Sequence, residues 1–124
     1  MMTSPETKPK ATGITRIIRA FGYSRDGLVS TFRKEAAFRQ ECVAAAVLIP
    51  LAFFIAPDKA MMAMMIAAVL LVMVVELLNS AIEAAIDRFG PEHHPLAKHA
   101  KDAGSAAVLV ALILAALVWL IALT

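Results

Sequence analysis

The sequence is poor in the residues that build disulfides and phosphate-binding loops. It has one cysteine, Cys42, so no disulfide can form within the chain, and the apolar run around it is typical of a small packing residue. The five glycines form neither Gly-x-x-x-x-Gly-Lys-[Ser/Thr] nor Gly-x-Gly-x-x-Gly. The two familiar glycine-rich loops that hold nucleotide phosphates are therefore excluded.

Histidine is also scarce, and its three copies are His93, His94 and His99. They lack the zincin spacing of two histidines four residues apart with a glutamate between them, and no cysteine lies near them in the sequence. We interpret them as surface residues around a short loop rather than as zinc ligands.

Charged residues make up only 18% of a chain that is 60% hydrophobic, which excludes an ordinary soluble domain. The apolar residues gather in three blocks, and each block with its flanks approaches the roughly 20 residues that cross a bilayer. We predict an all-α membrane protein with spans at about 35–56, 60–87 and 98–123. Pro50 should kink the first span. No apolar core of signal-peptide type precedes these spans, so we expect insertion without cleavage.

Positive charge is concentrated on one side of the predicted spans. Only Lys59 lies in the turn between the first two spans, whereas Arg88, Lys98 and Lys101 lie between the second and third. By the positive-inside rule, the N-terminus and the second loop are cytoplasmic and the C-terminus is outside. The basic residues before the first span agree with this orientation: Lys8, Lys10, Arg16, Arg19, Arg25, Arg33, Lys34 and Arg39.

The N-terminal part divides into a tail and a helix. Residues 1–12 are polar, and we expect them to stay disordered. Residues 13–33 have apolar side chains at helical spacing and arginines between them, a pattern typical of an amphipathic helix on a membrane surface. Gly22 offers a hinge between its two halves. Residues 34–124 then form the membrane domain.

The most informative stretch lies at the end of the second span. An ionisable side chain within a span costs about 2.5–3.5 kcal/mol, so such residues usually face a bundle interior and mark a site or pathway. The alternative is that the helix leaves the bilayer near Ser80 and exposes a solvated acidic face. At about 100° per residue, five polar side chains share roughly a 100° sector of one helix: Glu76, Asn79, Ser80, Glu83 and Asp87.

The depth of these carboxylates can be counted from the outer turn. At about 1.5 Å per residue, Glu83 and Glu35 lie at similar depths of about 35 and 33 Å. Glu76 lies about 24 Å down, inside the roughly 30 Å hydrocarbon layer and near its cytoplasmic boundary. Lys101 and Asp102 lie at the start of the third span, at the same depth as Glu83 and Glu35. The spacing predicts two carboxylates at the water interface and one slightly deeper.

The third span carries two packing signals. Trp119 near its outer end suits the aromatic belt of a membrane protein. Small residues recur every four positions, a stripe that permits close helix contact in lipid: Ala103, Ala107, Ala111 and Ala115.

Two kinds of chemistry fit these residues. Interfacial carboxylates could hold Mg²⁺ that bridges nucleotide phosphates, since this ion prefers one or two carboxylates with phosphate oxygens and water. The deeper Glu76 could then be a general base for a hydroxyl that the lipid phase delivers. From the residues alone, a small oligomeric ion channel or proton-coupled transporter, with the acidic stripe as its ion path, is an equal alternative.

Motifs in three separate helices resemble one family. They are Glu35-Ala-Ala-Phe-Arg-Gln-Glu41, Glu76-Leu-Leu-Asn-Ser-Ala-Ile-Glu83 with Asp87-Arg88, and Ala100-Lys-Asp-Ala-Gly-Ser-Ala-Ala-Val108. At this spacing the chain resembles the bacterial integral-membrane diacylglycerol kinases over about residues 13–123. The segment Gly13-Ile-Thr-Arg16-Ile-Ile-Arg19-Ala-Phe-Gly-Tyr23-Ser24 is similar to the Gram-negative branch.

The resemblance implies an enzyme that phosphorylates diacylglycerol with Mg-ATP to give phosphatidic acid. It also implies a homotrimer with shared active sites in the bacterial inner membrane, with a cytoplasmic active site, a periplasmic C-terminus and no nucleic-acid partner. By resemblance, Glu76 is the general base and Glu35 and Glu83 hold the metal.

The same resemblance assigns the binding residues. Asn79 and Asp87 would orient the site from a supporting shell. The nucleotide would contact Arg16, Tyr23, Glu35, Glu83, Glu92, His93, His94, Lys101 and Asp102. The lipid substrate would lie near Arg16, Gln40, Glu41, Glu76 and Ser105.

The chain departs from familiar members at two positions. They often carry Trp where this chain has Arg25, and Tyr where it has His93. These departures affect how the surface helix lies on the membrane and how the adenine end of the nucleotide is bound. Within the fold, undecaprenol kinase, the activity of the Gram-positive relatives, is the alternative, and the N-terminal motif disfavours it.

Overall fold

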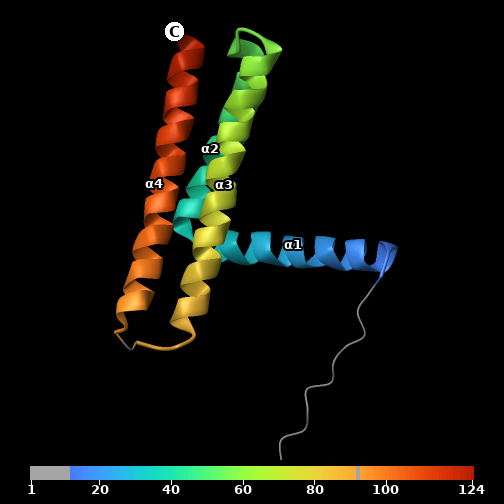
Figure 1. Cartoon of the computed structure of the whole chain (residues 1–124). Coiled ribbons are helices and arrows are strands. Elements are labelled where there is room, and N and C mark those ends of the chain that lie inside the picture. The colour runs from blue at the N-terminus through green and yellow to red at the C-terminus, as the bar shows by residue number, and fades with distance from the viewer. Residues whose placement is uncertain (1–11, 92) are drawn as a thin grey trace, which may run out of the picture.

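The computed structural model of the chain describes residues 12–91 and 93–124. The helices are α1 (Ile14–Lys34), α2 (Ala36–Ile55), α3 (Lys59–Asp87) and α4 (Pro95–Leu123). In Figure 1, α2, α3 and α4 run alongside one another, and α1 projects sideways from the start of α2. Three helices, α2, α3 and α4, are long and apolar enough to cross a membrane. The predicted all-α fold with three spans is confirmed, whereas residues 1–11 of the predicted tail lie outside the described residues.

Capping residues set where the two long helices begin. The Asp58 carboxylate accepts the Met61 N–H at 2.8 Å and so starts α3 after a short outer turn. His94 Nδ1 accepts the Leu96 N–H at 3.1 Å, and Pro95 occupies the first position of α4, where a missing N–H does no harm. For this reason α4 begins at Pro95 rather than near residue 98, where we predicted it.

Helix α1 is continuous across Gly22, so the predicted hinge is wrong. One glycine lowers helix stability by only about 1 kcal/mol, which the neighbouring residues can offset. None of its residues is buried. Large apolar side chains such as Ile14 and Phe21 stay exposed on this single chain, as an amphipathic helix that lies on a membrane requires.

A single extended residue, Glu35, joins α1 to α2. Its N–H donates to the Thr31 carbonyl at 2.8 Å, and Arg39 Nη1 donates to the carbonyls of Phe32 and Arg33, both at 2.9 Å. The last carbonyls of a helix have no partner within it, so the Arg39 guanidinium caps α1 from the first turn of α2. This cap fixes the direction in which α1 leaves the spans.

Helix α3 lies at the centre, because both α2 and α4 pack on it. Small residues of both neighbours are buried along with those of α3, such as Ala52 of α2 and Ala111 of α4. Phe38 is fully buried near the joint with α1. Many other large apolar side chains remain exposed; Phe54, at 87%, is the extreme case. Lipid or further copies of the chain can cover such a surface.

The predicted alanine stripe of α4 is covered over only half of its length in the single chain. Ala111 is buried and Ala115 half-buried, but Ala103 and Ala107 are exposed. A repeat of four drifts by about 40° per step around a helix of 3.6 residues per turn. The inward face starts instead at Gly104.

Trp119 has a second role besides its predicted place near the outer end. Its indole N–H donates to the Met65 carbonyl of α3 at 3.2 Å. Because a carbonyl oxygen has two lone pairs, it can accept this bond in addition to its helical one. The indole thus ties α4 to α3.

Replacing Trp119 by Phe should lower the free energy of unfolding in mixed micelles. The expected loss is about 0.6 kcal/mol and at most about 1.7, the range for interhelical hydrogen bonds in membranes. Titration with a denaturing detergent, followed by circular dichroism, measures it. The control is Phe54→Leu, which also changes an aromatic residue of the outer half, and equal stability of Trp119→Phe and wild type would contradict the prediction.

Replacing Arg39 by Gln should loosen the joint. One net hydrogen bond contributes about 1 kcal/mol, which corresponds to roughly fivefold more frequent opening of the last turn of α1. Amide hydrogen exchange in lipid nanodiscs detects it at residues 31–35. Arg19→Gln removes the same charge from α1 and should leave this exchange unchanged; an equal increase in both variants would point to charge rather than to the cap.

Candidate active site

The polar face of α3 passes from the interior to the surface along the helix. Glu76 and Asn79 are buried, with 7% and 9% of their surface exposed. Ser80 and Glu83 are half-buried, and Asp87 is exposed. The alternative of a solvated acidic face therefore fits Asp87 and is wrong for Glu76 and Asn79.

A hollow of about 510 Å³ lies between α2 and α4, with Glu76 and Asn79 of α3 in its wall. Four of its lining residues are ones that the resemblance places near the lipid substrate: Gln40, Glu41, Glu76 and Ser105. The fifth polar residue, Asn79, is one that it assigns to the supporting shell. Ala44, Val108 and Leu112 supply apolar wall on the side of the membrane interior. Among the described residues, one oxygen of Glu76 and one of Glu41 are buried without a hydrogen-bond partner. A buried carboxylate oxygen without a partner carries a free-energy cost that a hydrogen-bond donor would relieve.

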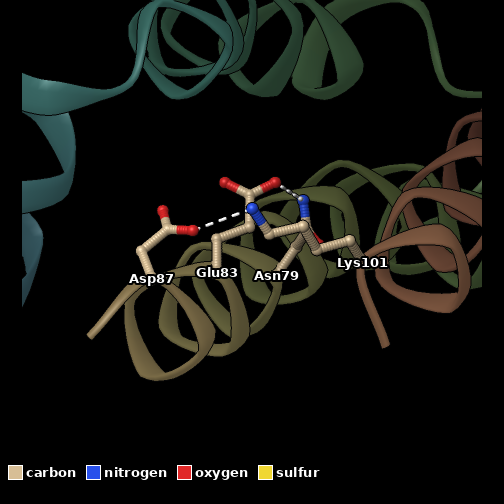
Figure 2. Close-up of polar contacts among 4 residues, drawn as sticks. All are labelled: Asn79, Glu83, Asp87 and Lys101. Atoms are coloured by element: carbon tan, nitrogen blue, oxygen red, sulfur yellow. Dashed lines mark hydrogen bonds and ion pairs between the residues drawn. The ribbon is translucent and has the colours of Figure 1, made fainter. Parts of the chain in front are cut away.

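Glu35 and Glu83 meet around Ser80. The Ser80 hydroxyl donates to Glu35 Oε1 at 3.4 Å. Asn79 Nδ2 donates to Glu83 Oε1, also at 3.4 Å (Figure 2). Residues three apart on a helix have Cβ atoms about 5–6 Å apart, so the Ser80 bond brings Glu35 within one turn of Glu83. Counting residues predicts equal depths for Glu35 and Glu83. The bond instead places Glu35 at Ser80, three residues or about 4.5 Å along the α3 axis from Glu83.

Two ion pairs lie where α3 ends and α4 begins. Lys101 Nζ reaches the Asp87 carboxylate at 2.8 Å, passing Glu83, as Figure 2 shows. Lys98 pairs with Asp102 at 2.6 Å, one turn apart on α4. Asp87, Lys101 and Asp102 also line a second hollow of about 760 Å³ with His93 and His94. Glu92, predicted to contact the nucleotide, lies outside the described residues.

Arg16 and Tyr23 do not join this group within one chain. Both are exposed on α1, Tyr23 at 72%. Arg16 precedes Glu35 by nineteen residues, which is about 28 Å along the helix. Figure 1 shows this part of α1 pointing away from the spans.

Two contributors had no predicted role in the site. Ser80 shares the acidic face of α3, which is the signal that could have identified it. Arg39 stands inside the Glu35-to-Glu41 motif, but its contacts are backbone carbonyls across the joint. No sequence pattern specifies such contacts, because every residue has a carbonyl.

No group of three or more His, Cys, Asp and Glu side chains that could hold a metal by itself was found within residues 12–91 and 93–124. The site instead offers Glu35 and Glu83 as a pair. One or two carboxylates completed by phosphate oxygens and water are the pattern of Mg²⁺ bound with a nucleotide.

Comparison with known proteins shows the family of the chain. The model for prokaryotic diacylglycerol kinase matches residues 22–123. Over 110 residues, 89% of this chain and 93% of the relative, the sequence is 51% identical to a diacylglycerol kinase of Haemophilus influenzae. It is 52% identical over 112 residues to one of Escherichia coli, covering 90% and 92%, and 51% identical over 116 residues to one of Pseudomonas aeruginosa, covering 94% of each. The chain belongs to the prokaryotic diacylglycerol kinase family.

Proposed function

We propose that the protein transfers the γ-phosphoryl group of ATP to the primary hydroxyl of diacylglycerol, which gives phosphatidic acid and ADP. Family membership supports the reaction class. The observation that carries the site assignment is the buried Glu76 carboxylate in the wall of a hollow between two membrane-spanning helices. A lipid hydroxyl that enters there can donate its hydrogen to this carboxylate.

Glu76 acts as the general base. The lipid oxygen forms a bond to the γ-phosphorus, the bond from phosphorus to the β-phosphate oxygen breaks, and the hydroxyl proton passes to the Glu76 carboxylate. A general base contributes about 10²- to 10⁴-fold to such a rate. Gln40, Glu41 and Ser105 share the hollow and orient the glycerol end of the lipid.

Glu35 and Glu83 hold Mg²⁺ together with the nucleotide phosphates. The fit rests on their donor atoms and on the Ser80 bond that brings Glu35 within one turn of Glu83. When bound, the ion neutralises charge on the β- and γ-phosphates. Asn79 orients the Glu83 carboxylate through its amide, and Asp87 holds Lys101 nearby.

The second hollow receives the nucleotide. Lys101 can turn from Asp87 toward a phosphate, since both side chains are about half exposed or more. Asp102, His93 and His94 line the same hollow, with Glu92 beside them in the sequence. These groups lie on the cytoplasmic side by the positive-inside rule.

The assembly is a homotrimer in the bacterial inner membrane, with α1 on the cytoplasmic surface and the C-terminus in the periplasm. Within one chain Arg16 is about 28 Å from Glu35 along α1. Its part in nucleotide and lipid binding, and that of Tyr23, therefore falls to the site of a neighbouring copy. The exposed apolar faces of the spans provide surface for such contacts.

Glu76→Gln should abolish transfer while the protein stays folded, because the amide keeps the shape but cannot take the proton. We expect a loss of at least about 10²-fold, measured with γ-labelled Mg-ATP and a short-chain diacylglycerol in micelles. Wild-type activity of this variant would refute the base assignment.

Offering undecaprenol as a second acceptor in the same assay distinguishes diacylglycerol kinase from undecaprenol kinase. Transfer only to undecaprenol would favour undecaprenol kinase. Failure of the folded wild type to phosphorylate either lipid would favour the channel or transporter.

Glu35→Ala and Glu83→Ala should raise the Mg²⁺ concentration needed for half-maximal rate. We expect a shift of about tenfold or more. Loss of a residue that only supports a metal ligand already lowers metal affinity by about 10- to 100-fold, and loss of the ligand itself should lower it at least as much as the smaller of these values. Asp26→Asn, which removes a carboxylate from α1, serves as the control. A Mg²⁺ dependence equal to wild type in both alanine variants would refute the metal assignment.

A further inference from the structure

Gly104 of α4 packs against the Asn79 side chain of α3. Gly104 is buried, and a Cβ atom built on it overlaps Asn79 Oδ1. The same Cβ would lie 3.3 Å from Asn79 Cγ but 4.0 Å from Asn79 Cβ. At Gly22 and Gly27, which are also helical, a built Cβ meets nothing within 4 Å. Space at Gly104 is thus limited by the amide end of one side chain.

The orientation of the Asn79 amide follows from its two neighbours. Its nitrogen donates to Glu83 Oε1 at 3.4 Å, and its oxygen is buried without a hydrogen-bond partner among the described residues. Since the Cβ direction of Gly104 leads to this oxygen, one Cα–H of the glycine points at it. Weak Cα–H···O contacts of this kind recur between packed helices. The reversed amide would turn its oxygen toward the Glu83 carboxylate, acceptor against acceptor, which is unfavourable.

We propose that Gly104 is a positioning residue that orients Glu83 through Asn79. The missing side chain leaves room for the amide oxygen, so the amide nitrogen can face the Glu83 carboxylate. A methyl group at position 104 would displace the amide from that place and leave Glu83 free to turn. This inference rests on the proposed role of Glu83 in holding Mg²⁺.

The test is a double-mutant cycle on the full-length protein in micelles. The readout is binding of Mn²⁺ with a non-hydrolysable ATP analogue, followed by electron paramagnetic resonance, which needs no turnover. Gly104→Ala should weaken Mn²⁺ binding by about 10- to 100-fold, the range for groups that orient a metal ligand. In the Asn79→Ala background the same change should have less than about a twofold effect, because the nearest remaining atom, Cβ of residue 79, lies at an ordinary contact distance of 4.0 Å.

Gly27→Ala adds the same methyl group to a helix where there is open space, and it should bind Mn²⁺ like wild type. Equal weakening by Gly104→Ala in both backgrounds, or none in either, would overturn the inference. If Gly104→Ala alone fails to fold, a folded double variant with the Mn²⁺ affinity of Asn79→Ala supports the coupling. A double variant that also fails to fold refutes it.

Glu83→Gln distinguishes this inference from the proposed function. Wild-type Mn²⁺ binding by Glu83→Gln would remove Glu83 from the metal site, whatever happens at Gly104. Weak binding by Glu83→Gln together with normal binding by Gly104→Ala would refute only the role of Gly104.

Discussion

The structure depends on one constraint, which is that a membrane-spanning helix carries a carboxylate and an amide that must be kept from lipid. Glu76 and Asn79 meet this constraint because α3 lies at the centre, with α2 on one side and α4 on the other. Glu76 lines the hollow between these neighbours, and one of its buried oxygens has no hydrogen-bond partner among the described residues. A carboxylate within a membrane span carries a free-energy cost. This cost favours a functional role over a structural one.

The joint at Glu35 relates this interior to the membrane surface. Glu35 is the only residue between α1 and α2, and Arg39 holds the end of α1 in place from the next turn. The backbone at Glu35 therefore cannot shift without moving α1, a helix of about 30 Å. Since the Glu35 carboxylate also accepts the Ser80 hydroxyl, the level of α1 is tied to one turn of α3. Figure 1 shows both α3 and α4 continuing beyond α1 on the side of their connecting loop.

The sequence was sufficient for features that a single helix encodes. Hydrophobic runs gave the three spans, and the 3.6-residue period placed Glu76 and Asn79 on one face. Features that depend on how two helices approach were missed: the Trp119 bond to a backbone carbonyl, the cap by Arg39 and the turning of the alanine stripe away from α3 at Ala103. Backbone acceptors are the same at every residue, so composition and spacing carry no signal for them. The assignments of base, metal ligands and nucleotide contacts came from the family resemblance, and they stay predictions.

The proposed reaction requires a water-soluble nucleotide and a lipid hydroxyl to meet, and the arrangement on α3 makes this possible. Glu76 and Glu83 are seven residues apart, about 10 Å along the helix axis, which is a long way for a single reacting phosphoryl group to bridge. Ser80 lies between them and holds Glu35 there, only about 6 Å along the axis from Glu76. Glu35, a proposed metal ligand, thus stands between Glu76, the proposed base, and Glu83, the other proposed metal ligand. The Ser80 hydroxyl is therefore the contact that brings the metal end of the proposed site within reach of the lipid end.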